Sequence, residues 1–217
     1  MIEDVLARIL GQTPRLSVAG RTDAGVHAQG QVTSFEADLD PAKVQRALNA
    51  TLGPEVVALS AERAPQGFDA RRSATGREYR YRIDTGPVPD PFTARYVWHR
   101  PGRLSVAEML AAARLLEGEH DFASFCRVPQ SSPSTVRTLR RLSVRSAGDV
   151  IEVRATADGF LHQMVRSLVG TVVWVGEGRL PPGAMPEILA ARSRAAAAPV
   201  APPHGLTLMR VLYSRRR

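Results

Sequence analysis

A single carboxylate lies between two glycines in residues 20–27, whose sequence is GRTDAGVH. The carboxylate belongs to Asp23, and Gly20 and Gly25 can adopt backbone torsions that other residues resist. An aspartate in such a loop can act as a nucleophile, a general base or a metal ligand. A metal site would need more carboxylates or histidines close by, and only His27 is near. The alternative is an aspartate that caps a turn, a common role beside glycine.

Tyr79 is a second candidate, within an alternating stretch at residues 78–83. The alternation predicts a strand with Tyr79 and Tyr81 on one face. A functional tyrosine there could stack on a nucleobase or move a proton through its hydroxyl. The alternative is a tyrosine that only fills the core, as is usual in a half-buried strand.

Arg166 is a third candidate, because it interrupts an apolar stretch at residues 160–175 that predicts a helix. A buried guanidinium is costly unless a carboxylate pairs with it. Asp23 is a candidate partner, and Asp149 and Asp158 are competitors. The alternative is an arginine whose head group reaches solvent at the edge of the helix.

The remaining reactive side chains show no metal pattern. His27, His120 and His162 fit no common metal-ligand spacing, so we interpret them as polar or RNA-contacting residues. Cys126 is the only cysteine and is expected to be an inert core thiol. Several arginines could follow a phosphate backbone or form a solvated charged face: Arg71, Arg72, Arg77, Arg80, Arg82, Arg137, Arg140 and Arg141.

Composition favours a packed domain with a nucleic-acid partner. The 217 residues are 44% hydrophobic and carry a net charge of +8, almost entirely from arginine because Lys43 is the only lysine. Arginine suits phosphate and base edges, although a GC-rich genome would also favour arginine codons. No apolar run is long enough for a membrane span and the first residues are acidic, so we expect a cytoplasmic protein with no membrane partner.

Hydrophobic periodicity and turn residues predict an α+β fold with a mainly antiparallel sheet. A boundary between two halves is expected near residues 87–101, and a basic tail at residues 215–217. The predicted helices are at residues 2–10, 41–52, 105–117, 160–175 and 186–194. A first strand is predicted to end near residue 19. The other predicted strands lie at residues 31–36, 56–59, 78–83, 96–98, 139–145, 150–157 and 205–213.

Taken together, these motifs resemble the signatures of the tRNA pseudouridine synthase A family. Residues 20–27 closely resemble its first signature, and the resemblance continues in order over essentially the whole chain. The further matching segments are residues 68–74 (FDARRSA) with 77–81 (REYRY), 118–125 (GEHDFASF), 160–170 (FLHQMVRSLVG), and Ala201 with 205–206 (GL).

The resemblance implies a role for each site residue. Asp23 matches the catalytic aspartate, the nucleophile required to break the uridine glycosidic bond and rejoin the base through carbon. The resemblance leaves open attack on the ribose, attack on the uracil ring and a glycal route. Tyr79 matches the tyrosine that packs on the target base, Arg166 the basic residue that pairs with the aspartate, and Arg21 a residue near the RNA backbone. No cofactor and no metal are implied, because the base leaves and returns within one site.

The resemblance also implies an architecture and a partner. The expected fold is two ferredoxin-like halves, residues 1–95 and 96–217, whose sheets join across a central RNA-binding cleft. The expected assembly is a homodimer with tRNA spanning both subunits. The expected targets are uridines of the anticodon stem-loop, at tRNA positions 38–40.

One departure from the family pattern concerns the start of the chain. Family members usually begin with a strand and a loop ahead of the first helix, whereas Met1 stands here where that helix begins. We therefore expect an unpaired sheet edge, lower stability and weaker RNA binding than in a full-length relative. An alternative function is a catalytically weak or inactive tRNA-binding module. A metal-dependent nucleic-acid hydrolase is a third hypothesis, weakened by the lone carboxylate.

Overall fold

The computed structural model describes residues 1–127 and 134–214, so the predicted basic tail lies outside the described residues. The chain forms two compact units. The first comprises Met1–Arg21 and Val32–Ala74, and the second comprises Thr22–Gln31 and Thr75–Arg217. The segment that carries Asp23 therefore belongs to the second unit, although it is flanked in sequence by the first.

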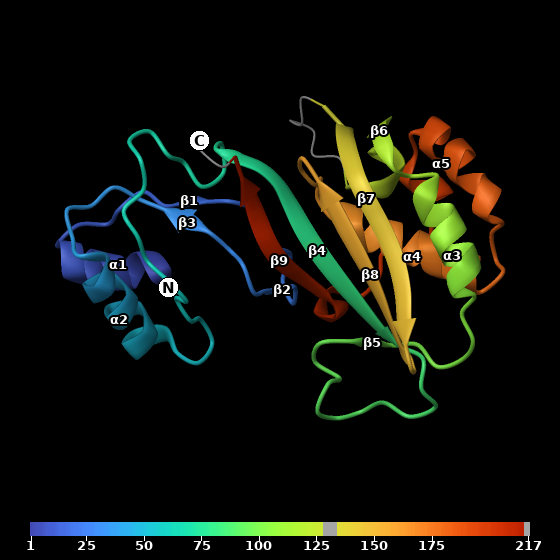
Figure 1. Cartoon of the computed structure of the whole chain (residues 1–217), viewed down its shortest axis with the longest axis horizontal. Helices are drawn as coiled ribbons and strands as arrows, with labels where there is room; N and C mark the ends of the chain where they lie inside the picture. The colour runs from blue at the N-terminus through green and yellow to red at the C-terminus, as the bar shows by residue number, and fades with distance from the viewer. Residues whose placement is uncertain (128–133, 215–217) are drawn as a thin grey trace. The chain divides into compact units, whose positions relative to one another are not determined.

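The first unit contains two helices and a short strand pair (Figure 1). Its elements are α1 (Ile2–Leu10), α2 (Pro41–Leu52), β1 (Ser17–Val18) and β3 (Thr33–Ser34), and the two strands pair antiparallel. Asp40 caps α2 by accepting a hydrogen bond from the N–H of Ala42, and Pro41 occupies the first helical position. Both helices are confirmed at their predicted bounds.

The second unit is built on a mixed sheet whose strand order is β2-β9-β4-β8-β7-β6, with β5 paired to β4 outside this path. The described strand pairs are antiparallel for β4–β8, β6–β7 and β7–β8, and parallel for β2–β9 and β4–β5. The bounds are β2 (His27–Ala28), β4 (Ala74–Asp84), β5 (Trp98–His99), β6 (Gly118–Asp121), β7 (Val136–Ala147), β8 (Val150–Ala157) and β9 (Leu206–Tyr213).

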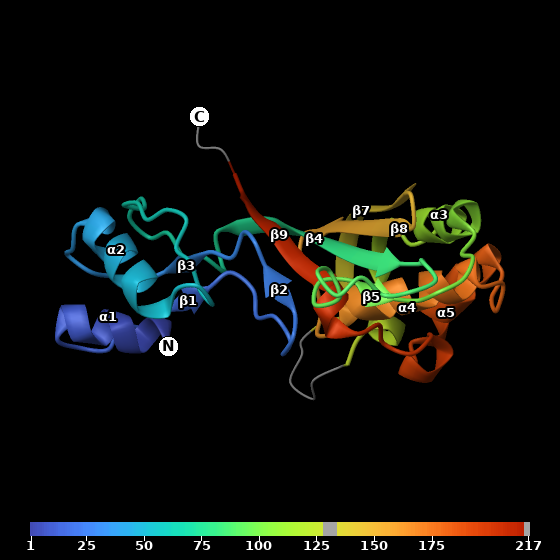
Figure 2. The same cartoon turned by 90° about the horizontal axis from the view of Figure 1, so that it is seen from below.

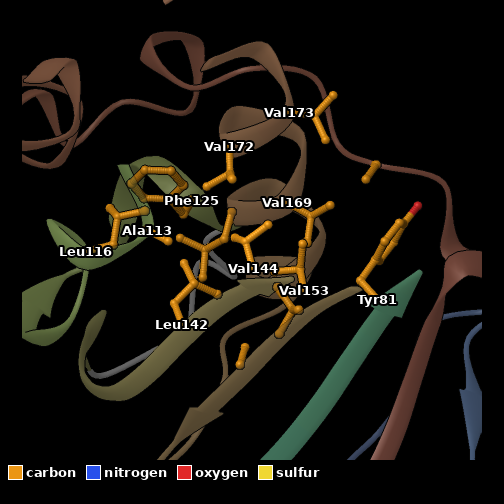
Figure 3. Packing of buried hydrophobic residues seen from close by; sticks show 14 of the residues in the cluster. Tyr81, Ala113, Leu116, Phe125, Leu142, Val144, Val153, Val169, Val172 and Val173 are labelled. Carbon is orange, nitrogen blue, oxygen red and sulfur yellow. The ribbon is translucent and has the colours of Figure 1, made fainter. Parts of the chain in front are cut away.

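Helices α3 and α4 lie beside the β7–β8 hairpin in both views (Figures 1 and 2). Figure 3 shows Val144 and Val153 of the hairpin pointing toward Val169 and Val172 of α4. Burial of such side chains is the main source of stability in this unit. The helices are α3 (Val106–Arg114), α4 (Met164–Gly176) and α5 (Met185–Ala191), with 3-10 turns η1 (Ala123–Phe125), η2 (Pro182–Ala184), η3 (Arg194–Ala196) and η4 (Pro203–Gly205).

Several predicted elements are wrong or shifted. The strand expected at residues 56–59 is absent, because side chains of α2 bind that backbone instead of a neighbouring strand. Gln45 donates to the carbonyls of Ala58 and Leu59, and the side-chain oxygen of Asn49 accepts from the N–H of Ala58 at 2.6 Å. Strand β6 was not predicted.

Other elements begin later or end earlier than predicted. The predicted strand at residues 31–36 shrinks to β3, and the one at 96–98 moves to β5. Helix α4 begins at Met164 rather than at residue 160, because Gln163 has a left-handed backbone with φ 61°. Helix α5 stops before Arg192, which is also left-handed.

Helices combined with a mixed sheet agree with the predicted α+β class. The two compact units do not coincide with the predicted halves, residues 1–95 and 96–217. The units are defined by compactness, whereas the halves are defined by the expected repeat of a ferredoxin-like fold. That division into two ferredoxin-like halves stays a prediction.

Candidate active site

Asp23 stands at the start of a tight turn. The N–H of Val26 donates to the Asp23 carbonyl at 3.0 Å, and Gly25 has φ 83°. Glycine is the residue that adopts this torsion without strain. A Cβ atom at Gly25 would also lie 3.1 Å from Cγ of Pro203. The turn is therefore closed by the backbone of Asp23, which leaves its carboxylate available for contacts elsewhere.

Strand β2 fixes this turn to the edge of the sheet. His27 and Ala28 pair in parallel with Thr207 and Leu208 of β9, and both views show the two strands side by side (Figures 1 and 2). The pairing continues beyond the strand, because the N–H of Gln29 donates to the Leu208 carbonyl at 2.8 Å. The Asp23 segment is thus held by backbone hydrogen bonds to the last strand of the chain.

Arg166 of α4 pairs with Asp23, as predicted. Its Nη1 donates to Oδ2 of Asp23 at 2.6 Å, and its Nε donates to the Ala201 carbonyl at 2.7 Å. The Ala201 N–H in turn donates to the Arg166 carbonyl at 3.1 Å. The Arg166 side chain is only 12% exposed, so the alternative of a solvent-seeking arginine is excluded. Asp158, a predicted competitor, instead accepts hydrogen bonds from backbone N–H groups.

His162 is the site residue that sequence reasoning missed. Its Nε2 lies 3.3 Å from Oδ1 of Asp23, and its side chain is 44% exposed. The sequence alone indicates only a polar or RNA-contacting residue. The signal that could have identified it is its spacing of four residues from Arg166, which places two side chains on one face when the segment is helical.

Tyr79 of β4 is buried, with 7% of its surface exposed, and its ring meets Phe160 edge-on at a centroid distance of 5.2 Å. Burial raises the pKa of the Tyr79 hydroxyl to about 12. The positive charge of Arg77 opposes this change, and the negative charge of Asp23 adds to it. Tyr79 therefore keeps its phenolic proton at neutral pH and lies within the electrostatic reach of Asp23.

Tyr81 contacts the segment at residues 202–205, which packs against the Asp23 turn. Its hydroxyl donates to the Pro202 carbonyl at 2.8 Å, and its ring would clash with a Cβ atom at Gly205. Pro203, the residue after Pro202, lies next to Gly25 of the Asp23 turn. Tyr79 and Tyr81 share one face of β4, as predicted, but Tyr81 is a packing residue.

The other predicted polar residues have contacts of their own or belong to the first unit. Arg21 belongs to the first unit and is exposed, and its role stays a prediction. His27 contacts the Arg95 carbonyl at 2.9 Å, and His120 contacts the Glu117 carbonyl at 3.0 Å. Cys126 is buried and burial raises the pKa of its thiol, which agrees with an inert core residue.

Several arginines of the predicted phosphate-tracking set make contacts within the protein. Arg77 donates to the Asp158 carbonyl and Arg140 to the Thr75 carbonyl. Arg80 lies 3.9 Å from Glu152. These arginines help to hold the sheet, so they are not simply a free cationic surface.

Residues 1–127 and 134–214 contain no group of three or more His, Cys, Asp or Glu side chains placed to hold a metal ion. No helix within those ranges has the length and apolar character needed to cross a membrane.

Comparisons with known proteins identify the family. A family model described as tRNA pseudouridine synthase matches residues 112–214. Proteins named tRNA pseudouridine synthase A are similar over nearly the whole chain. The Geobacillus kaustophilus protein is 43% identical over 97% of this chain and 83% of its own length. The Mesorhizobium japonicum protein is 47% identical over 98% and 88%, and that of Moorella thermoacetica 45% over 96% and 85%. The chain belongs to the tRNA pseudouridine synthase A family.

Proposed function

We propose that this protein isomerises uridine to pseudouridine in tRNA, with Asp23 as the nucleophile. The observation that carries the proposal is the Asp23 carboxylate, held at 2.6 Å by Arg166 at a tight turn on the edge of the sheet. The names of its relatives support the reaction and the tRNA substrate. In this proposal the reaction needs one nucleophile, and the Asp23 carboxylate supplies it.

The isomerisation conserves every atom of the nucleotide. The bond from N1 of uracil to C1′ of ribose breaks, a bond from C5 to C1′ forms, C5 loses a proton and N1 gains one. No oxidant or reductant is consumed, so the chemistry requires no redox cofactor. In this proposal Asp23 supplies the electron pair that stabilises the separated fragments, and the guanidinium of Arg166 fixes and balances its charge.

Tyr79 fits a base-packing role in the same scheme. Its pKa of about 12 keeps the ring neutral, so it can pack on uracil without placing a second negative charge beside Asp23. Its neutral hydroxyl can also donate a hydrogen bond or pass on a proton.

The finer features of the family are also part of this proposal. The substrate site is the anticodon stem-loop, and the active assembly is a homodimer in the cytoplasm. Two ferredoxin-like halves, residues 1–95 and 96–217, enclose a central cleft, with Arg21 near the RNA backbone. The net charge of +8 supports a polyanionic partner.

Tritium release from tRNA transcripts labelled at C5 of uracil tests the function, because isomerisation frees that atom. The wild-type protein should release tritium, and Asp23→Asn should not. Asp38→Asn is a matched control, because the Asp38 side chain is 99% exposed and should leave the rate unchanged. Equal release by Asp23→Asn would contradict the role of Asp23. Binding of tRNA without release would indicate a binding module, and chelator-sensitive strand cleavage would indicate a hydrolase.

The same assay locates the target uridines. Transcripts in which cytidine replaces the anticodon stem-loop uridines should release no tritium, whereas replacement of uridines elsewhere should leave release unchanged. Release from the first set would contradict the proposed stem-loop specificity while leaving the reaction itself established.

A further inference from the structure

Arg166 alone does not fix the orientation of the Asp23 carboxylate. Its Nη1 donates to a single oxygen, Oδ2, because its Nε is already donated to the Ala201 carbonyl. One contact at one oxygen leaves rotation about the Cβ–Cγ bond open, since a torsion to an sp² carbon has a broad energy profile. A second contact at Oδ1 would remove that freedom.

His162 lies where the second contact is needed. Its Nε2 is 3.3 Å from Oδ1, on the oxygen that Arg166 does not touch. An Nε2 that carries its proton would attract the carboxylate, whereas an unprotonated nitrogen would face it lone pair to lone pair. The distance is slightly long for a hydrogen bond, as is common for catalytic contacts before substrate binds.

Hydrogen bonds hold the backbone around His162. The His162 carbonyl accepts a hydrogen bond from the N–H of Arg127 at 3.1 Å, and the N–H of Met164 donates to the Leu161 carbonyl at 3.1 Å. Between these anchors Gln163 adopts φ 61° and ψ 5°, a left-handed torsion that non-glycine residues rarely adopt. Strain of this kind persists where surrounding contacts enforce it, often at functional sites.

We propose that His162 is a positioning residue for Asp23: its Nε2–H holds Oδ1 while Arg166 holds Oδ2, and together they fix the plane of the carboxylate. Both side chains come from one short segment, residues 162–166, which leads from a turn into the first residues of α4. The predicted effect of this role on kcat rests on the proposed function, in which Asp23 is the nucleophile. It differs from an RNA-contacting role, which would act on tRNA affinity.

Kinetics of three variants at this position separate the two roles. His162→Phe and His162→Ala remove the donor and should lower kcat by about tenfold or more, with KM for tRNA within about twofold of wild type. His162→Gln retains a side-chain N–H and should recover kcat to within about threefold of wild type. His99→Gln is the matched control, because that histidine contacts the Gly86 carbonyl at 2.9 Å, and it should leave both constants unchanged.

Three kinetic results would overturn the proposal: an unchanged kcat in His162→Phe, a raised KM with unchanged kcat, or equal losses in His162→Phe and His162→Gln. Melting temperatures of all variants should match wild type within a few degrees, because the side chain is 44% exposed. A large drop confined to the variants with low kcat would also overturn it, since unfolding would then explain the loss.

Crystal structures of wild type and His162→Phe provide a test of the proposal that does not depend on activity. The wild-type carboxylate should occupy one orientation, and in His162→Phe it should rotate or occupy more than one. An unchanged single orientation in His162→Phe overturns the proposal even if kcat falls. If the wild-type protein released no tritium, the proposed function would fail, and this structural comparison would still decide the role of His162.

Discussion

Two carboxylates of the second unit, Asp23 and Glu78, each have a nitrogen-bearing side chain near each oxygen. Around Glu78, Nη1 of Arg154 is 3.4 Å from Oε1 and Nε of Arg210 is 2.7 Å from Oε2. Around Asp23, the corresponding groups are His162 and Arg166. The two clusters share a pattern of pairing but differ in which partner is buried.

The Glu78 side chain is 10% exposed, whereas Arg154 and Arg210 are 45% and 66% exposed and project from strands β8 and β9. The acid is inside and its cations are outside, so the cluster joins strands. The order is reversed at Asp23, where Arg166 is 12% exposed and the carboxylate, on a turn, is 22% exposed. A buried, fixed cation that presents an accessible acid suits chemistry, and a buried acid covered by arginines suits stability.

Among the residues that surround the Asp23 carboxylate, substitution of Arg166 should have the largest effect. Arg166→Ala should lower kcat for tritium release by about 10²-fold, because a charge-assisted hydrogen bond to the reactive carboxylate is lost. Arg166→Lys should lose less, about tenfold, since a lysine keeps the charge but cannot bind Asp23 and the Ala201 carbonyl together. Equal losses in the two variants would show that charge contributes nothing.

Gly25→Ala should reduce activity less than Arg166→Ala. An alanine at φ 83° is strained, and its Cβ would press on Pro203. We expect kcat to fall by about tenfold as the turn shifts and moves Asp23. Gly148→Ala is the matched control, because Gly148 has φ 59° in the β7–β8 hairpin and open space around it. It should cost stability and leave kcat unchanged. A fall of kcat in both variants would contradict a specific role for the Asp23 turn.

Glu78→Gln should reverse the pattern, with an effect on stability and little on activity. The free energy of unfolding should fall by about 1 kcal/mol, because the exposed arginines are screened by solvent and contribute modestly. Urea unfolding measures the loss, and tritium release at 25 °C should stay within about twofold of wild type. A kcat that fell as far as in Arg166→Ala would erase the distinction between the clusters.

Tyr79→Phe should alter the alkaline stability profile by a small amount. The pKa of the Tyr79 hydroxyl is about 12 in the folded protein against an ordinary value of 10, so the unfolded chain loses this proton first as pH rises. Stability from this group is complete below pH 10 and is lost through about pH 12. Between pH 9 and 10.5 the wild type should lose about 0.8 kcal/mol more unfolding free energy than Tyr79→Phe. Equal losses in urea unfolding would contradict a buried, protonated Tyr79.

The features predicted best from the sequence are those set by neighbouring residues in the chain or by the free-energy cost of burying a charge. Asp40 and Pro41 specify the start of α2 within two residues. Gly148 at φ 59° makes the turn between β7 and β8. The need to pair a buried guanidinium led from Arg166 to Asp23 across 143 residues, and the structure contains that pair.

Features set by distant contacts escaped prediction. Strand β2 is two residues long and exists because β9, at the other end of the chain, pairs with it. The backbone at residues 56–59 is held by Gln45 and Asn49 of α2, so its strand-like composition is overridden. The left-handed torsion of Gln163, which makes the predicted helix begin after His162, also depends on contacts that the local sequence does not reveal.

The most direct test of the contrast compares Asp23→Asn with Glu78→Gln in single-turnover tritium release, with urea unfolding of both. Each variant replaces one paired carboxylate by an amide of the same shape. Asp23→Asn should lower the rate by about 10³-fold or more while staying folded, and Glu78→Gln should react at nearly the wild-type rate while unfolding at lower urea. Tritium release by Asp23→Asn at the wild-type rate would contradict Asp23 as the nucleophile.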